Sequence, residues 1–115
     1  MMLPGDIAIA FSNGLFKNVY PHLTDDVEWT VIGERYLKGR QAVIDHCEQV
    51  AAYFNSVETV FKITNVIVDK HRVAINGTAE FIKAKQRLSF VHACDVYEFN
   101  NNLQLERITS YCIQQ

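Results

Sequence analysis

Asp95 is the residue whose type and position most suggest chemistry. It lies in the middle of an apolar segment, Ser89 to Phe99, two residues before Tyr97. A carboxylate there either faces solvent or points into a site that uses its proton or charge. It could equally be a surface or dimer-face carboxylate, paired across a hairpin with Arg107. The sequence leaves both alternatives open, because a one-residue change of register exchanges the two faces of a strand.

The other reactive side chains are scattered along the chain. The four histidines show neither HxH nor HExxH spacing, so no metal site is predicted: His22, His46, His71 and His92. His92 precedes Asp95 by three positions, so the two face opposite sides of a regular strand. Three widely spaced cysteines, Cys47, Cys94 and Cys112, favour reduced thiols in the cytoplasm. No histidine is placed to activate Cys112 as a nucleophile.

A long β-hairpin is predicted to position Asp95. Its two arms, 89–99 and 103–113, are rich in Val, Tyr, Phe, Ile and Thr. Asn100 to Asn102 predicts the turn, since asparagine tolerates positive φ and bonds its own backbone. Two further strands, 59–69 and 72–84, precede this hairpin, with Lys70 and His71 as their turn.

The N-terminal half is predicted to hold three helices and two short strands. Ile7, Phe11 and Leu15 fall at four-residue spacing on a helix that Asp6 can cap. A short helix is predicted over 17–23 and the longest over 40–55. Residues 24–26 are predicted to turn into a strand at 27–32, and a brief strand follows at 36–38.

Length and element order predict one α+β domain over residues 1–115. Strands that follow segregated helices pack as a sheet with helices on one side. The expected fold is a strongly curved, mostly antiparallel sheet wrapped around three helices of the N-terminal half, with a conical pocket between them.

Composition excludes several classes of function. The net charge is −2 and no Lys/Arg cluster occurs, so nucleic-acid binding is not predicted. No apolar run approaches the roughly 20 residues of a membrane span. The first eleven residues lack the features of a signal peptide, which favours a cytoplasmic location.

Three local motifs, in this order, resemble those of a known superfamily. They are Leu23-Thr24-Asp25-Asp26-Val27-Glu28-Trp29 followed by Gly33, then Lys38-Gly39-Arg40-Gln41-Ala42-Val43, and finally Cys94-Asp95-Val96-Tyr97-Glu98-Phe99 with Arg107-Ile108-Thr109-Ser110-Tyr111. Over essentially the whole chain, the sequence resembles the nuclear transport factor 2-like superfamily. The similarity is greatest to its SnoaL-like (polyketide cyclase) and ketosteroid isomerase branch.

This resemblance implies a role for Asp95. In the isomerases, the matching aspartic acid is kept protonated by apolar surroundings and donates a hydrogen bond to the developing oxyanion. The general-base aspartate of that family falls at Trp29, however, and its oxyanion-hole tyrosine falls near Ala8. Steroid isomerisation by that mechanism is therefore not expected. The cyclases use a His and an Asp on neighbouring strands, and His92 does not supply that pair.

The resulting hypothesis is a pocket for a small apolar or aromatic molecule, with Asp95 as its polar anchor. The predicted pocket walls are Trp29, Tyr97, Phe99, Phe11, Cys112 and Tyr53. One alternative is a cofactor-independent enzyme of isomerase, cyclase or dehydratase type with Asp95 as catalytic acid or base. Another is an interaction module without a ligand. No cofactor is predicted, and the resemblance implies a homodimer formed through the open sheet face.

Overall fold

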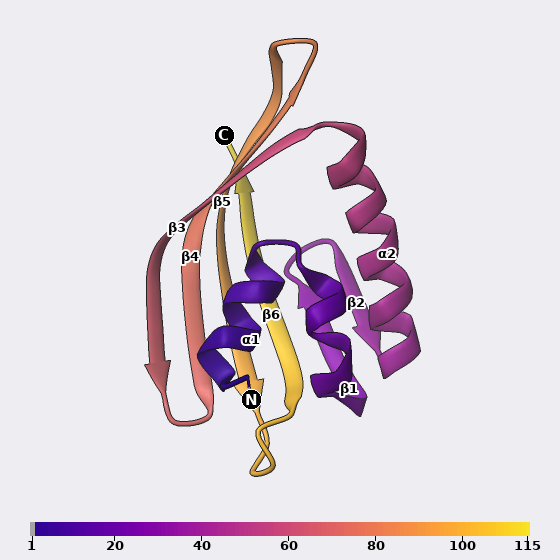
Figure 1. The fold of residues 1–115 in the computed structure, drawn as a ribbon, viewed down its shortest axis with the longest axis vertical. Helices are drawn as coiled ribbons and strands as arrows, with labels where there is room; N and C mark the ends of the chain where they lie inside the picture. Colours follow the sequence, from indigo (N-terminus) through magenta and orange to yellow (C-terminus); the bar gives the residue numbers. More distant parts are fainter. Residues whose placement is uncertain (1) are drawn as a thin grey trace.

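The computed structural model describes residues 2–115, which form one curved sheet with helices on one side (Figure 1). The strand order is β2-β1-β6-β5-β4-β3. The helical elements are α1 (Pro4–Ser12), the 3-10 turns η1 (Phe16–Asn18) and η2 (Tyr20–His22), and α2 (Arg40–Ser56). The strands are β1 (Leu23–Val31), β2 (Arg35–Lys38), β3 (Glu58–Asp69), β4 (Arg72–Lys83), β5 (Gln86–Phe99) and β6 (Leu105–Gln114).

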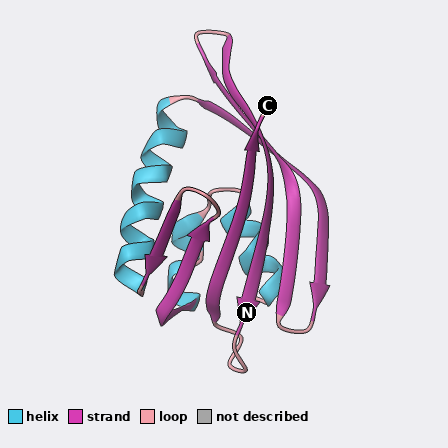
Figure 2. Ribbon diagram, turned by 180° about the vertical axis from the view of Figure 1, so that it is seen from behind, coloured by secondary structure: helices cyan, strands magenta, loops and turns pink. Residues whose placement is uncertain are grey.

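The predicted α+β fold is confirmed, with one difference in the sheet. Neighbouring strands pair antiparallel except β1 and β6, which run parallel and make the sheet mixed. The helices cover one face only, and Figure 2 shows the other face bare of helices. The core lies between the covered face and the helices, where Ile7, Val43 and Ile108 are fully buried.

Helix α1 both starts and ends earlier than the sequence predicts, and Asp6, the predicted cap, lies within its first turn. Pro4 occupies its first turn, and the Asp6 carboxylate accepts a hydrogen bond from the Leu3 N–H at 3.0 Å. The helix ends at Ser12, and Gly14 turns the chain with φ of +77°. Leu15 therefore leaves the predicted apolar stripe and is exposed.

The segment after α1 differs from its prediction. The helix predicted over 17–23 is two 3-10 turns, because Pro21 has no N–H to extend a helical ladder. Val19 and Leu23, two apolar residues of this segment, are nevertheless buried. The turn predicted at 24–26 is wrong: these residues belong to β1, where the pairing with β6 shifts register between Leu23 and Glu28.

The β5–β6 hairpin places Asp95 opposite Ser110 on β6 and Ile75 on β4. Its connection begins at Asn100 as predicted, and of the two predicted causes the hydrogen bonds between the asparagine side chain and the backbone are confirmed. The Asn100 side chain accepts hydrogen bonds from the backbone N–H groups of Asn102 at 2.9 Å and Gln104 at 3.0 Å. Positive φ falls on Leu103, at 60°, rather than on an asparagine.

A bulge bends the sheet where β3 crosses β4. The register shifts between Ile63 and Asn65, opposite Gly77. A Cβ on Gly77 would lie 2.2 Å from the carbonyl oxygen of Lys62, so only glycine fits there. Within residues 2–115, no helix is both long and apolar enough to cross a bilayer.

Candidate functional site: a cavity between the sheet and the helices

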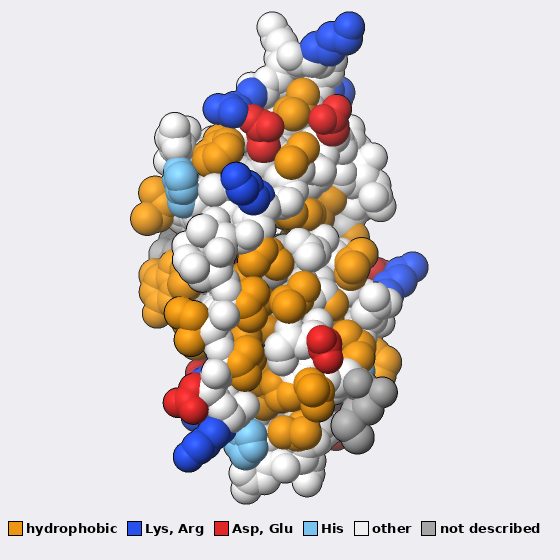
Figure 3. Space-filling model, turned by 60° about the vertical axis from the view of Figure 1, so that its left-hand side comes forward, with side chains coloured by type: hydrophobic (Ala, Val, Ile, Leu, Met, Phe, Trp, Pro, Cys, Tyr) orange, Lys and Arg blue, Asp and Glu red, His pale blue; other side chains and the backbone are white. Residues whose placement is uncertain are grey.

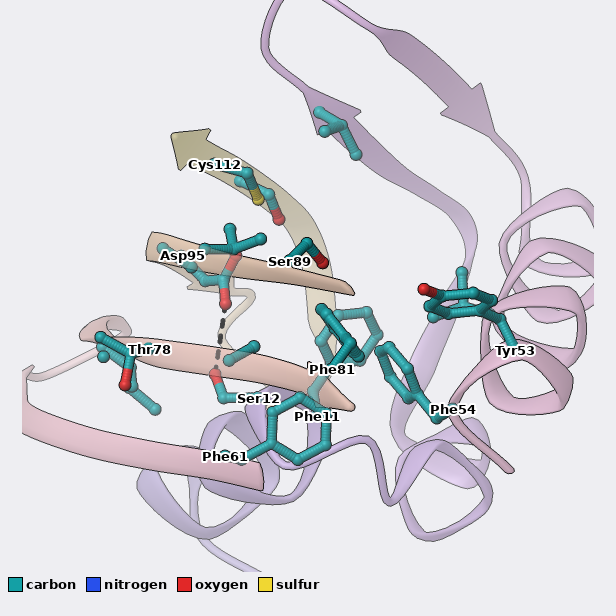
Figure 4. Close-up of a pocket in the computed structure, with 18 of the residues that line it drawn as sticks. Phe11, Ser12, Tyr53, Phe54, Phe61, Thr78, Phe81, Ser89, Asp95 and Cys112 are labelled. Carbon is teal, nitrogen blue, oxygen red and sulfur yellow. Dashed lines mark hydrogen bonds between the residues drawn. The ribbon is translucent and has the colours of Figure 1, made fainter. Parts of the chain in front are cut away.

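A cavity of about 620 Å³ lies between the concave face of the sheet, the end of α1 and the inner face of α2 (Figure 4). Most of its lining is apolar and much of it aromatic. The aromatic residues that line it are Phe11, Phe16, Trp29, Tyr53, Phe54, Phe61 and Phe81. Its size and character match those of sites for small organic molecules.

The rings at one end of the cavity pack around Phe54 of α2. Phe54 stacks on Phe81 at 5.6 Å between ring centroids with 16° between their planes, and meets the edge of Phe61 at 5.1 Å. Tyr53 contacts Phe81 at 5.5 Å. This end therefore presents ring faces and edges to any occupant, which suits a planar apolar group.

Asp95 lies at the other end of the cavity, among hydroxyl groups (Figure 4). The Ser12 Oγ lies 3.4 Å from Asp95 Oδ2, and the Tyr97 hydroxyl lies 3.4 Å from the same oxygen. Ser12 and Tyr97 also share a hydrogen bond of 2.5 Å. The end of α1, through Ser12, and strand β5 thus hold one oxygen of the carboxyl group.

Burial raises the pKa of Asp95 above its ordinary value. Hydrogen bonds from Ser110, Ser12 and Tyr97 act in the opposite direction, because they stabilise the carboxylate, but they do not cancel the effect of burial. Asp95 therefore holds its proton to higher pH than an exposed aspartic acid does. In that form it can donate a hydrogen bond into the cavity.

Trp29 connects the acid to the helix side of the cavity. Its Nε1–H donates a hydrogen bond to the Ser110 Oγ at 3.0 Å, and Ser110 pairs with Asp95 across the sheet. The Trp29 ring lies 5.2 Å from that of His46 on α2. Burial lowers the pKa of His46, and the nearby Arg35 lowers it further.

The structure brings four of the predicted pocket residues to the wall of the cavity that Asp95 also lines. These are Phe11, Trp29, Tyr53 and Cys112. Cys112 lies at the wall with its pKa raised to about 11 by burial and by Asp95, so its thiol is protonated near neutral pH.

The placement of Tyr97 and Phe99 on the pocket wall is wrong. Both point to the concave side but are 0% and 1% exposed, and neither lines the cavity. Phe11 packs edge-on against Tyr97 at 5.9 Å between ring centroids and lies between Tyr97 and the cavity. The surface pairing of Asp95 with Arg107 is also wrong, because Arg107 lies on the outer face with Glu98 and Glu28.

Sequence reasoning missed most of the polar residues that line this site, including the three that lie nearest Asp95 and Trp29. Ser12, His46 and Ser110 all line the cavity. His46 lies three residues after Val43 and four before Val50, so helical spacing could have placed it on the inward face of α2. Ser12 and Ser110 carry no such signal, because a lone serine is common at helix ends and in strands.

Among residues 2–115, no three His, Cys, Asp or Glu side chains gather closely enough to hold a metal ion. Besides aromatic rings and hydroxyl groups, the cavity lining includes two acids, Asp95 and Glu34, together with Lys62 and His46.

A bent sheet that closes over helices around one cavity is the architecture of the nuclear transport factor 2-like proteins. Within that class, the family model of the SnoaL-like domain matches residues 7–109, and the chain belongs to this family. No protein of curated function matches the chain.

Solved structures agree with this assignment. An NTF2-like protein of unknown function from Cytophaga hutchinsonii is 36% identical, with a TM-score of 0.84 over 93% of both chains. An LEH-like epoxide hydrolase from M. tuberculosis is 20% identical, with a TM-score of 0.66 over 91% of this chain and 75% of the hydrolase. A putative SnoaL-like polyketide cyclase from Jannaschia is 11% identical, with a TM-score of 0.74 over 95% of this chain and 84% of the cyclase. At these two lower identities the likeness concerns the fold alone.

Proposed function

We propose that this protein binds a small, largely apolar, planar molecule and holds one acceptor oxygen of that molecule with Asp95. The observation that carries the proposal is a carboxyl group of raised pKa at one end of an otherwise largely aromatic cavity. Apolar burial against the rings around Phe54 supplies affinity, and Asp95 supplies orientation.

The hydrogen bonds of Asp95 define what it offers a ligand. Ser12 and Tyr97 both contact Oδ2, and Ser110 also hydrogen-bonds to the carboxyl group. A protonated carboxyl donates to a carbonyl or ether oxygen, whereas a carboxylate would require a donor from the ligand. Raising the pKa of Asp95 widens the pH range in which it selects ligands that accept a hydrogen bond.

The second candidate is an enzyme of isomerase, cyclase or dehydratase type in which Asp95 gives a proton to the substrate. The same observation favours it, since a carboxyl whose pKa is raised by burial is a more suitable general acid than an exposed one. Turnover that Asp95→Asn abolishes, in a substrate that the wild-type protein binds and converts, would establish this function.

Binding can be tested with two ligands of equal shape, tetralin and 1-tetralone, of which only the ketone accepts a hydrogen bond. We expect 1-tetralone to bind roughly three- to tenfold more tightly, because one hydrogen bond contributes about 0.5–1.5 kcal/mol. Ligand-observed NMR gives both dissociation constants. Trp29 is the one tryptophan of the chain and lines the cavity, so quenching of its fluorescence reports occupancy.

The variant Asp95→Leu should remove the preference for the ketone while tetralin still binds. His92→Leu is the matched control, since His92 lies on the same strand but does not line the cavity. Equal affinity of wild-type protein for the two ligands, or an unchanged preference in Asp95→Leu, would refute the role of Asp95.

A further inference from the structure

His46 is the ionisable side chain beside Trp29 that the proposed function leaves unused. It lines the cavity from α2, with its ring 5.2 Å from the ring of Trp29. Its Nδ1 is buried and has no hydrogen-bond partner. The imidazole as a whole is only partly buried, so Nε2 is the ring nitrogen that an occupant can reach.

The buried Nδ1 determines where the imidazole proton lies. A proton on Nδ1 would be a buried donor without an acceptor, which costs more than a buried lone pair with no donor. The neutral ring therefore carries its proton on Nε2. Burial and Arg35 both lower the pKa of His46, and a contact with Gln49 opposes this effect without reversing it. The imidazole is accordingly neutral at physiological pH and acts as a donor.

The neighbouring polar groups are already engaged. Trp29 Nε1–H donates to Ser110, and Ser12 is hydrogen-bonded to Tyr97 and Asp95. Other polar side chains, among them Lys62 and Gln114, also line the cavity. Asp95 is linked to Trp29 through Ser110, and His46 contacts the Trp29 ring directly.

We propose that His46 is a second hydrogen-bond donor of this cavity, so that the preferred ligands carry two acceptor oxygens on opposite sides of a small ring system. This inference rests on the proposed function and narrows its ligand class to cyclic ketones with a second ketone or ether oxygen. It makes His46 a specificity-determining residue rather than a base, because its accessible nitrogen already holds the proton.

A third ligand completes the series used for Asp95. 4-Chromanone has the frame of 1-tetralone with a ring CH2 replaced by an ether oxygen, on the side away from the ketone. We expect it to bind roughly threefold more tightly than 1-tetralone to the wild-type protein, the lower end of the range for one hydrogen bond. In His46→Phe this advantage should vanish, while the preference for 1-tetralone over tetralin persists. His46→Gln, which keeps an N–H donor, should retain part of the advantage of 4-chromanone over 1-tetralone. The control His71→Phe, in the β3–β4 turn, should leave all three affinities unchanged.

The outcomes separate the two proposals. If 1-tetralone binds more tightly than tetralin but 4-chromanone has no advantage, or keeps its advantage in His46→Phe, the role of His46 is refuted and that of Asp95 stands. If tetralin binds as well as both ketones, or if none of the three binds, both proposals fail.

A second measurement needs no ligand. In a long-range 1H–15N spectrum of the histidine rings near neutral pH, His46 should show an unprotonated Nδ1 and a protonated Nε2, with its signals assigned by their absence in His46→Phe. A proton on Nδ1, in either the neutral or the charged ring, would overturn the inference.

Discussion

Asp95 is a single carboxyl whose behaviour is set by the residues around it. Three hydroxyl groups stabilise its charged form and burial opposes it, and burial is the larger effect. An acid whose pKa is higher in the folded chain than in the unfolded chain binds protons more tightly when folded. Its contribution to stability is therefore present at low pH and is lost as pH rises through the folded pKa.

This balance gives a prediction for the pH dependence of stability. The free energy of unfolding of the wild-type protein, relative to that of Asp95→Asn, should fall as pH rises above the ordinary aspartic value of 3.8 and level off above the folded pKa. The total fall in the free energy of unfolding is about 1.4 kcal/mol for each tenfold difference between the acid dissociation constants of Asp95 in the folded and the unfolded chain. Urea unfolding of both proteins across this pH range measures it, and a difference that stays constant or grows with pH would contradict a raised pKa.

At the scale of single residues, the sequence predicts which face of a strand a side chain is on, because alternate residues point to the same face. Asp95 and Tyr97 share a strand face, so both were expected to point the same way, and they do. Parity does not say how deep a side chain lies. Tyr97 is closed off by Phe11 and Ser12 from α1, and that contact depends on where a helix distant in sequence settles.

At the scale of elements, the periodicity of apolar residues predicted α2 and the four long strands. It did not predict the conformation of the short segments or which strands pair in parallel. The two turns η1 and η2 replace a predicted helix because Pro21 interrupts the ladder. The parallel pairing of β1 with β6 had no local signal, since it joins residues almost the whole chain apart. The positive φ of Leu103 was also unpredictable, because leucine does not favour it.

The bulge at Gly77 yields a prediction at this scale. Gly77→Ala should lower the free energy of unfolding by about 1–3 kcal/mol or more, because its Cβ would overlap the Lys62 carbonyl oxygen at 2.2 Å and force β3 away from β4. Urea unfolding monitored by Trp29 fluorescence measures the change.

Gly5→Ala is the matched control for Gly77. Gly5 lies in α1, and a Cβ there would meet only Val68 Cγ2 at an ordinary 3.5 Å. The change should be neutral or stabilising, by up to about 0.5–1 kcal/mol, since alanine favours the helix. Equal effects of the two substitutions would show that crowding at the bulge is not what requires glycine.

At the scale of the whole molecule, the uncovered face of the sheet is unusual for an isolated chain. It exposes large apolar side chains on β3 and β6, among them Ile67, Tyr111 and Ile113. Exposed apolar side chains also continue along the edge strand β3, which Figure 3 views from its side. Patches of this kind mark interaction surfaces.

The partner we propose for this face is a second copy of the chain. Toward one end of the face, charged side chains are paired with one another, Arg107 with Glu98 and Glu28, and Arg72 with Glu98. Two copies therefore meet there without net repulsion. Light scattering after size exclusion should give twice the 13.2 kDa of one chain.

The double change Tyr111→Lys and Ile113→Lys should return the mass to that of one chain, because four buried ammonium groups would face each other across a two-fold interface. Leu15→Lys, equally exposed but beyond the end of α1, is the control and should leave the dimer intact. A wild-type protein with the mass of a single chain would refute this assembly.

The parallel pairing of β1 with β6 also governs the order in which the chain can fold. Trp29 pairs with Ile108 and Val31 with Ser110, so the strand that carries Trp29 gains its inner neighbour only when nearly the whole chain is available. During synthesis, the β3–β4 and β4–β5 hairpins can form first from local contacts, while β1 and α2 wait for β6 to leave the ribosome. The wall that joins Asp95, Ser110 and Trp29 is therefore among the last parts to assemble, and a chain that stops short of β6 lacks the Ser110 and Cys112 side of the cavity.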